Sequence, residues 1–314
     1  MTALELREKI VATAQKESAD LVGFAPAERF AGTKLAQIYP ECKTVICILY
    51  RVLRGAYRGV EEGTTFYQYT TNGVETLEET VLPGALLRVC AAIEDAGFTA
   101  IPQKKNQLLR EKKEDLRPEM MHTEFNPVWA REPQLDFTQA AVLCGLGEIG
   151  DAGTLLTDEF GPFQRYGLVL TDAVLPYDEV KTPHLCDHCG ACRAACPGHA
   201  IGADGKVNLH QCAAYYRGAS MHKNPYMPSD AYEGIENRHE VMDGTADLSF
   251  DEACKVMANT YFYPTIKHGY VSCICGRACD RACYVHLEEK GALTREFLRP
   301  FRKRPVWDLP MIDK

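Results

Sequence analysis

The chain has 314 residues, of which 46% are hydrophobic and 25% charged, as expected for a globular protein of one or two domains. Its net charge of −8 and its short basic stretches argue against a nucleic-acid-binding protein. No apolar run approaches the ~18 residues that a membrane span needs. Residues 1–20 lack the features of an export signal. We therefore expect a cytoplasmic protein with no membrane partner.

Helical and strand patterns alternate through roughly the first 178 residues. The helical patterns follow apolar spacing, whereas the strand patterns are short runs rich in β-branched residues. Within 75–96, Pro83–Gly84 should break or kink the helix. In chain order we predict a helix over 4–18, strands over 20–26 and 43–53, a helix over 75–96, a strand over 98–102, a helix over 139–150 that runs into a glycine turn, and a strand over 165–175. This alternation predicts an α/β layer fold.

The composition changes at the stretch "PYDEVKTPHLC", after which Cys, Gly, His and Tyr become frequent. A segment with so few long apolar runs cannot form a large hydrophobic core and needs another source of stability, which bound metal clusters would supply. The polar stretch between Cys212 and Cys273 should contain helices of its own or cover a site. We predict an α/β domain over 1–178, a cysteine-rich domain over 179–290 and a C-terminal tail over 291–314.

Four of the 14 cysteines begin the cysteine-rich segment in a recognisable pattern. Cys186, Cys189, Cys192 and Cys196, followed by Pro197, match C-x2-C-x2-C-x3-C-P, the bacterial ferredoxin run whose fourth cysteine serves the other cluster. This run favours a [4Fe–4S] cluster over zinc, because a zinc site would more naturally use two separated C-x2-C pairs. A disulfide scaffold is not expected in a reducing compartment.

Two clusters need eight thiolates, and a second cysteine group with the isolated Cys212 brings the total to nine. We assign Cys186, Cys189, Cys192 and Cys283 to the first cluster, and Cys196, Cys212, Cys275 and Cys279 to the second. Cys273 is left over, although the choice between Cys273 and Cys275 stays open. The other five cysteines are interpreted as packed thiols: Cys42, Cys47, Cys90, Cys144 and Cys254. Two adjacent clusters form an electron path. A plain ferredoxin would not need the α/β domain in front of it.

Residues 144–175, "CGLGEIGDAGTLLTDEFGPFQRYGLVLTDAVL", resemble the segment that precedes the clusters in cobalamin-dependent reductive dehalogenases and, less closely, in epoxyqueuosine reductase. The shared pattern is "GLGE.G", "LL", "T.E.GP" and "LTD", followed by the ferredoxin motif. The resemblance implies a nitroreductase-like α/β core that binds a base-off cobalamin, followed by a ferredoxin-like domain with two [4Fe–4S] clusters. It also implies reduction of a small-molecule substrate by a low-potential donor such as ferredoxin or flavodoxin. A homodimer is left open.

The resemblance also suggests where the corrinoid and a proton donor would lie. The expected corrinoid contacts are Gly145, Gly147, Gly150, Phe160, Gly161 and Pro162. The glycines would give close backbone approach, although a simple glycine turn explains them equally well. A large residue at Gly147 is expected to block cobalamin without unfolding the domain. The preferred candidates for the catalytic acid are Glu148 and Tyr67, followed by Tyr69, His122 and Glu124, each of which also has an ordinary structural interpretation.

The chain departs from the family pattern at several positions. Asp151 stands where Lys or Arg is usual, and Tyr284 follows Cys283 where Pro is usual. Arg131 and Glu132 lie near the place of an acidic residue of epoxyqueuosine reductases. No twin-arginine leader is present, and 31 residues follow Cys283.

Three functions therefore compete. The first is a corrinoid-dependent reductase of a small molecule. The second is an iron–sulfur electron-transfer or reductive-activation protein without its own corrinoid. The third is a tRNA-modifying epoxyqueuosine reductase, against which the acidic charge and the short C-terminal segment count.

Overall fold

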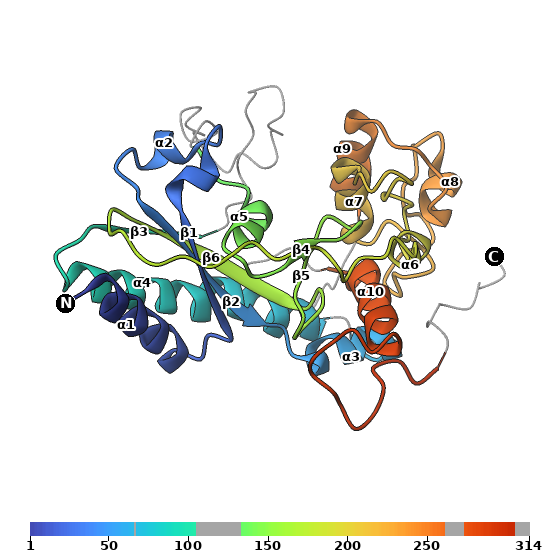
Figure 1. Cartoon of the computed structure of the whole chain (residues 1–314). Helices are drawn as coiled ribbons and strands as arrows, with labels where there is room; N and C mark the ends of the chain where they lie inside the picture. Colours follow the sequence, from blue (N-terminus) through green and yellow to red (C-terminus); the bar gives the residue numbers. More distant parts are fainter. Residues whose placement is uncertain (66, 105–132, 261–272, 305–314) are drawn as a thin grey trace. The chain divides into compact units, whose positions relative to one another are not determined.

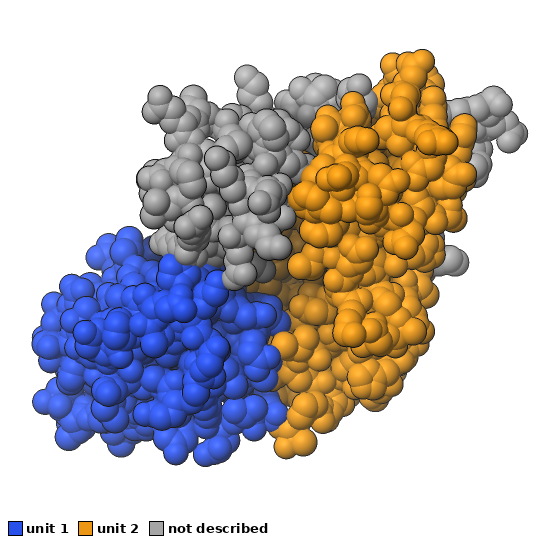
Figure 2. Space-filling model, turned by 90° about the horizontal axis from the view of Figure 1, so that it is seen from above, with its two compact units in different colours: residues 1–50, 81–146, 166–181 blue, residues 51–80, 147–165, 182–314 orange. Residues whose placement is uncertain are grey.

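The computed structural model describes residues 1–65, 67–104, 133–260 and 273–304, which form two compact units. Unit 1 comprises 1–50, 81–146 and 166–181, and unit 2 comprises 51–80, 147–165 and 182–314 (Figure 2). Each unit is discontinuous in sequence, unlike the expected division at residues 178 and 290. The difference arises because 51–80 and 147–165 pack with the cysteine-rich segment.

Unit 1 is built on a four-stranded sheet in the order β1-β2-β6-β3 (Figure 1). The strands are β1 (Leu21–Pro26), β2 (Thr44–Arg51), β3 (Ala100–Gln103) and β6 (Gln164–Thr171). β1 pairs antiparallel with β2, and β3 pairs antiparallel with β6. Every residue from Thr44 to Tyr50 is buried. This burial is what the apolar, β-branched sequence of a central strand predicts.

Helices cover the sheet of unit 1. Figure 1 shows α1 (Ala3–Lys16) and α4 (Leu82–Glu94) on one side and α5 (Phe137–Leu143) on the other. Two shorter helices, η1 (Ala27–Phe30) and α2 (Leu35–Ile38), follow β1. The predicted break at Pro83 is in fact the start of α4, because proline suits the first helical turn, where its missing N–H is not needed. Before it, η2 (Tyr69–Glu75) and η3 (Leu77–Val81) are π-helical and belong largely to unit 2.

Unit 2 contains mostly short helices and one small hairpin. The strands β4 (Glu148–Ile149) and β5 (Leu155–Leu156) pair antiparallel. The helices are α3 (Arg54–Glu62), α6 (Ala191–Ala194), α7 (Leu209–Tyr216), α8 (Arg238–Asp243), α9 (Phe250–Ala258) and α10 (Ala278–Glu289). As expected, the stretch between Cys212 and Cys273 has helices of its own, α8 and α9. Among the described residues, no helix is long and apolar enough to cross a membrane.

A stack of aromatic rings forms the centre of unit 2. Ring centroids are 4.4 Å apart for Tyr69 and Tyr57, 4.0 Å for Tyr57 and Phe163, and 4.3 Å for Phe163 and Tyr284. Phe301 packs edge-on against both Phe163 and Tyr284. These buried rings come from α3, η2, the loop before β6, α10 and the chain beyond α10. They therefore hold together segments that lie far apart in the sequence.

A buried ion pair anchors α10 to α3. The Glu61 carboxylate accepts hydrogen bonds from the guanidiniums of Arg281 and Arg302. Arg281 also donates to the carbonyls of Gly276 and Cys275, at 2.9 and 3.1 Å. Although burial opposes ionisation, the two guanidiniums hold the pKa of Glu61 below its usual value.

We expect Glu61→Gln to destabilise unit 2 by about 3–5 kcal/mol, because it leaves the buried Arg281 charge without its partner. Thermal unfolding of the anaerobically purified protein measures the change. The matched control is Glu62→Gln, whose carboxylate pairs with Arg58 in a more exposed position and should cost at most about 1 kcal/mol. Equal melting temperatures for the two variants would contradict the prediction.

Candidate metal centre

Four cysteine thiols of unit 2 line one cavity: Cys186, Cys189, Cys192 and Cys283. The chain can wrap around this cavity because His188 and Gly190 both adopt left-handed backbone conformations, with φ of 58° and 77°. Gly190 then begins α6, which carries Cys192. Cys283 comes from α10, which packs against α6. The structure thus brings together the four thiols that we assign to the first cluster.

The Glu148 carboxylate fixes the loop that enters this cavity. Glu148 is 4% exposed, and it accepts backbone N–H hydrogen bonds from His184, Leu185 and Cys186, the last two at 3.0 and 2.8 Å. A carboxylate that accepts several backbone donors is a strong anchor. Glu148 was our first candidate for the catalytic acid, but in this arrangement its carboxylate oxygens serve to position the cysteine loop.

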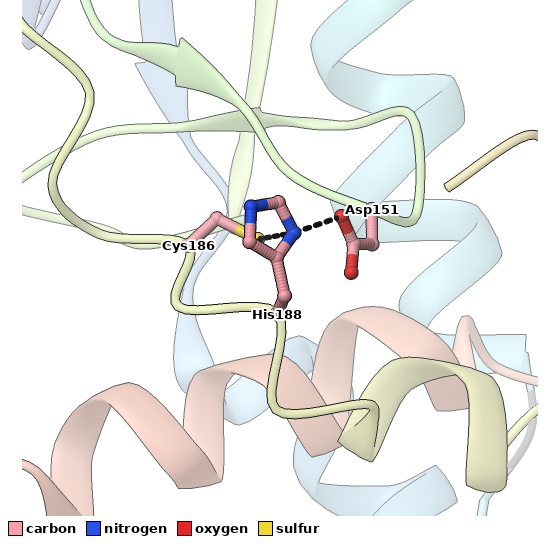
Figure 3. A group of neighbouring side chains, drawn as sticks. All are labelled: Asp151, Cys186 and His188. Atoms are coloured by element: carbon pink, nitrogen blue, oxygen red, sulfur yellow. Dashed lines mark hydrogen bonds and ion pairs between the residues drawn. The ribbon is translucent and has the colours of Figure 1, made fainter. Parts of the chain in front are cut away.

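Acid–histidine pairs flank the same cavity on two sides. Figure 3 shows the Asp151 carboxylate pointing at the His188 imidazole, with Oδ1 and Nδ1 2.8 Å apart, and the Cys186 sulfur beyond the ring. On the other side Asp187 accepts hydrogen bonds from His286 and Lys290, which lower the pKa of this carboxyl. Asp151, the residue that departs from the family pattern, is therefore placed beside the cysteine loop.

A second group of thiols gathers around α10: Cys196, Cys212, Cys275 and Cys279. Burial raises the pKa of Cys212 to about 11; Arg277 opposes this increase, and the nearby thiols of Cys275 and Cys196 add to it. Burial also raises the pKa of Cys279, with Cys275 and Cys212 again among its close neighbours. These thiols are therefore near enough to act on one another electrostatically.

Cys273 lies beside this second group but faces other neighbours. Its sulfur is 3.8 Å from that of Cys275, and its backbone N–H donates to Thr70 Oγ1 at 2.9 Å. Its thiol acts on Tyr69 and Tyr216, whereas Cys275 is the neighbour of the other three thiols. Because Cys275 is the thiol that acts on the pKa values of Cys196, Cys212 and Cys279, it stays our predicted ligand.

The remaining cysteines behave as packed thiols. Those at 42, 47, 90 and 144 are buried in unit 1, and Cys254 is half-buried on α9. All 14 cysteines lie in the described residues, and none is in a disulfide.

At the glycines expected to contact a corrinoid, other parts of the protein occupy the space that a side chain would need. A Cβ at Gly145 would lie 2.5 Å from the Glu179 carbonyl oxygen, and one at Gly147 only 1.9 Å from that of Leu156. At Gly150 it would meet the Leu156 side chain at 2.9 Å, and at Gly161 the Leu287 side chain at 3.2 Å. Close packing of the protein against itself is therefore enough to explain these glycines. The expectation that a large residue at Gly147 leaves the domain folded is wrong, because it would collide with β5.

The other site candidates fall in different places. Phe160 lines a second cavity of unit 2, whereas Pro162 is buried. Tyr67 is 36% exposed at the start of the π-helical segment, and Tyr69 is buried in the aromatic stack. Four candidates lie outside the described residues: His122, Glu124, Arg131 and Glu132.

Comparison with known proteins finds relatives of two kinds. An epoxyqueuosine reductase from Synechococcus sp. (strain RCC307) is 39% identical over 72 residues, 23% of this chain and 22% of the relative. A tetrachloroethene reductive dehalogenase from Desulfitobacterium hafniense is 42% identical over 64 residues, 19% of this chain and 12% of the relative. The chain is related to the superfamily of epoxyqueuosine reductases and cobalamin-dependent reductive dehalogenases. The matched segments span less than a quarter of these curated relatives. No family model matches the chain.

The solved structures of this superfamily extend the likeness to the fold. A reductive dehalogenase structure described as suggesting a mechanism for B12-dependent dehalogenation has a TM-score of 0.50 and 16% identity, over 81% of this chain and 37% of that one. Our expectation that a nucleic-acid partner is unlikely conflicts with the presence of epoxyqueuosine reductases among the relatives, so a nucleic-acid partner stays possible.

We expect Glu148→Gln to loosen the cysteine loop, because a neutral amide with a single acceptor oxygen cannot replace the carboxylate. Backbone amides of residues 184–186 should exchange hydrogen about tenfold faster, which corresponds to about 1.4 kcal/mol. Hydrogen-exchange mass spectrometry measures this rate. Glu289→Gln, an exposed glutamate at the end of α10, is the control and should leave these amides unchanged. Unaltered exchange in Glu148→Gln would refute the anchoring role.

Proposed function

We propose that unit 2 binds two [4Fe–4S] clusters. The first would be held by Cys186, Cys189, Cys192 and Cys283, and the second by Cys196, Cys212, Cys275 and Cys279. The observation that carries this proposal is the cavity in which Cys283 joins the three cysteines of the 186–192 run. The electrostatic coupling among the thiols of the second group supports it. Four thiolates are the usual ligand set of a [4Fe–4S] cluster.

The two clusters would lie side by side, because α10 supplies one ligand to each. Cys279 and Cys283 are four residues apart on this helix, so their side chains project from the same face one turn apart. In the ferredoxin run, Cys196 likewise follows three ligands of the first cluster but serves the second. An electron that arrives at one cluster would therefore pass readily to the other.

We further propose that the protein is a reductase of this superfamily, in which the clusters carry electrons from a low-potential donor to a small-molecule substrate. Support comes from the relatives, which are named as reductases. In this chain, Glu148 would hold the cysteine loop in place, and α10 would align the clusters. We propose a corrinoid requirement from the relatives alone, because the packing around the predicted glycines gives no separate support for it.

Epoxyqueuosine reduction is the second candidate. It is favoured by the 39% identity over 72 residues to the Synechococcus enzyme, a match comparable to that with the dehalogenases. Incubation of the reduced protein with epoxyqueuosine-containing tRNA, followed by nucleoside analysis, separates this candidate from a small-molecule reductase. Formation of queuosine would establish it, and an unchanged tRNA would leave the small-molecule substrate.

The cluster assignment predicts the metal content. The anaerobically purified protein should be brown and contain about eight iron atoms and eight sulfides per chain. Cys212→Ala should lose the second cluster and keep the first, which would halve the iron. Iron and sulfide analysis, with the low-temperature paramagnetic spectrum of the reduced protein, measures both.

Two other cysteines serve as controls for this prediction. Cys254→Ala, a packed thiol on α9, and Cys273→Ala, the thiol left out of the assignment, should both keep the full iron content. Loss of iron in Cys273→Ala with retention in Cys275→Ala would reverse the choice between these residues. Stoichiometric zinc without acid-labile sulfide would defeat the cluster proposal altogether.

Cobalamin titration tests the corrinoid requirement. If the protein is a corrinoid enzyme, the reduced wild type should bind cobalamin saturably in its base-off form, visible in the absorbance and in the Co(II) paramagnetic signal. The iron-loaded Cys254→Ala variant should bind it equally well. A protein that carries both clusters but ignores cobalamin would instead be an electron-transfer or reductive-activation protein.

A further inference from the structure

Unit 2 contains a second cavity, walled by aromatic rings and rimmed by arginines. Its aromatic walls are Phe160, Phe163, Tyr284 and Phe297, and its charged residues are Arg51, Arg54, Arg295 and Glu159. Its volume of about 250 Å³ suits a small organic molecule rather than a single ion. Phe297 is 46% exposed and Leu53 65% exposed, so the cavity opens to solvent through an apolar rim.

One arginine of this cavity has its charge available for a ligand. Arg54 is already paired with Glu288, at 2.9 Å. In contrast, the contacts of Arg295 within the described part of the chain are the faces of Phe160 and Phe297, with its guanidinium 5.5 and 5.8 Å from the ring centroids. Stacking on rings pre-orients a guanidinium and leaves its N–H groups free to bind a carboxylate in a bidentate manner.

A carboxylate also lines the cavity. Glu159 has no hydrogen-bond or ion-pair partner among the described residues; its Oε2 is closed off from solvent, so a ligand would meet this carboxylate through Oε1. A carboxylate in a largely aromatic cavity wall is poorly solvated, so a ligand that donates a hydrogen bond to its accessible oxygen would be favoured. Glu159 would at the same time disfavour a ligand with more than one negative group.

We propose that this cavity binds a flat molecule of one or two aromatic rings that carries one anionic group and one hydrogen-bond donor. The rings would stack between the aromatic walls, Arg295 would bind the anion, and Glu159 would accept the hydrogen bond. Each of these three features corresponds to a different part of the cavity wall.

The cavity adjoins the first thiol group through α10. Tyr284, one of its walls, directly follows Cys283 and stacks on Phe163. A molecule bound there would contact Tyr284, the residue next in sequence to a proposed ligand of the first cluster. Binding itself does not depend on the clusters or on a corrinoid, so its test is independent of the proposed function.

The probe is 6-hydroxy-2-naphthoate, which has two rings, one carboxylate and one hydroxyl. Anaerobic calorimetric titration of the full-length, cluster-loaded protein should show one saturable site. Arg295→Gln should weaken binding at least about tenfold, because a charge-assisted bidentate pair is lost. Arg299→Gln, an exposed arginine of the same segment outside the cavity, should change it less than about twofold. Equal loss in both variants, or no saturation in the wild type, would overturn the proposal.

Glu159→Gln provides a second test that does not require Arg295→Gln to fold. Wild type should prefer 6-hydroxy-2-naphthoate over 2-naphthoate, which lacks the donor, by about threefold to tenfold. Glu159→Gln should reduce this preference and bind 2-naphthoate more tightly than wild type does, because a repelling charge is gone. An unchanged preference would contradict the role of Glu159. Displacement of the probe by cobalamin would show that the cavity belongs to a corrinoid site, and would overturn the assignment.

Discussion

The spacing of two cysteines on one helix constrains the whole of unit 2. Cys279 and Cys283 stand one turn apart on α10, so the two thiol groups share a single rigid element. The position of α10 is in turn fixed by the buried Glu61–Arg281 pair and by the stacking of Tyr284 on Phe163. Any shift of this helix would change the spacing within both thiol groups at once. The ion pair and the aromatic stack therefore also set the spacing of the thiols, because they fix the position of α10.

The two thiol groups have different electrostatic surroundings. The first includes the exposed Cys189 and is flanked by the acid–histidine pairs Asp151–His188 and Asp187–His286. The second has no exposed cysteine and lies beside the largely buried Arg277, which is paired with Asp280 at 2.7 Å. Against the effect of burial, Arg277 lowers the pKa of the Cys212 thiol, whereas its partner Asp280 raises it. The two thiol groups, although both consist of four cysteines, therefore differ in exposure and in their charged neighbours.

Much of this organisation could be predicted from the sequence, since it depends on local patterns. The β-branched run of 43–53 predicted β2, and the four cysteines assigned to the first cluster do line one cavity. The long-range features could not be predicted in this way. Glu148 receives hydrogen bonds from residues 36–38 positions later, and the ring of Tyr57 meets that of Phe163. The glycines of the "GLGE.G" turn show why. A glycine is needed wherever another group packs closely against the backbone, and the sequence does not say whether that group is a chain segment or a cofactor.

The burial of Phe301 has a consequence for the order in which the protein is made. Phe301 completes the aromatic stack by packing on Phe163 and Tyr284. Unit 1 has all its segments once residue 181 has emerged from the ribosome, whereas unit 2 still lacks its last core ring until Phe301 has emerged. Since contacts between distant segments form only after the connecting chain is available, unit 2 must close late. The first cysteine run, 186–196, must therefore wait until Phe301 has been made before its hydrophobic support is complete.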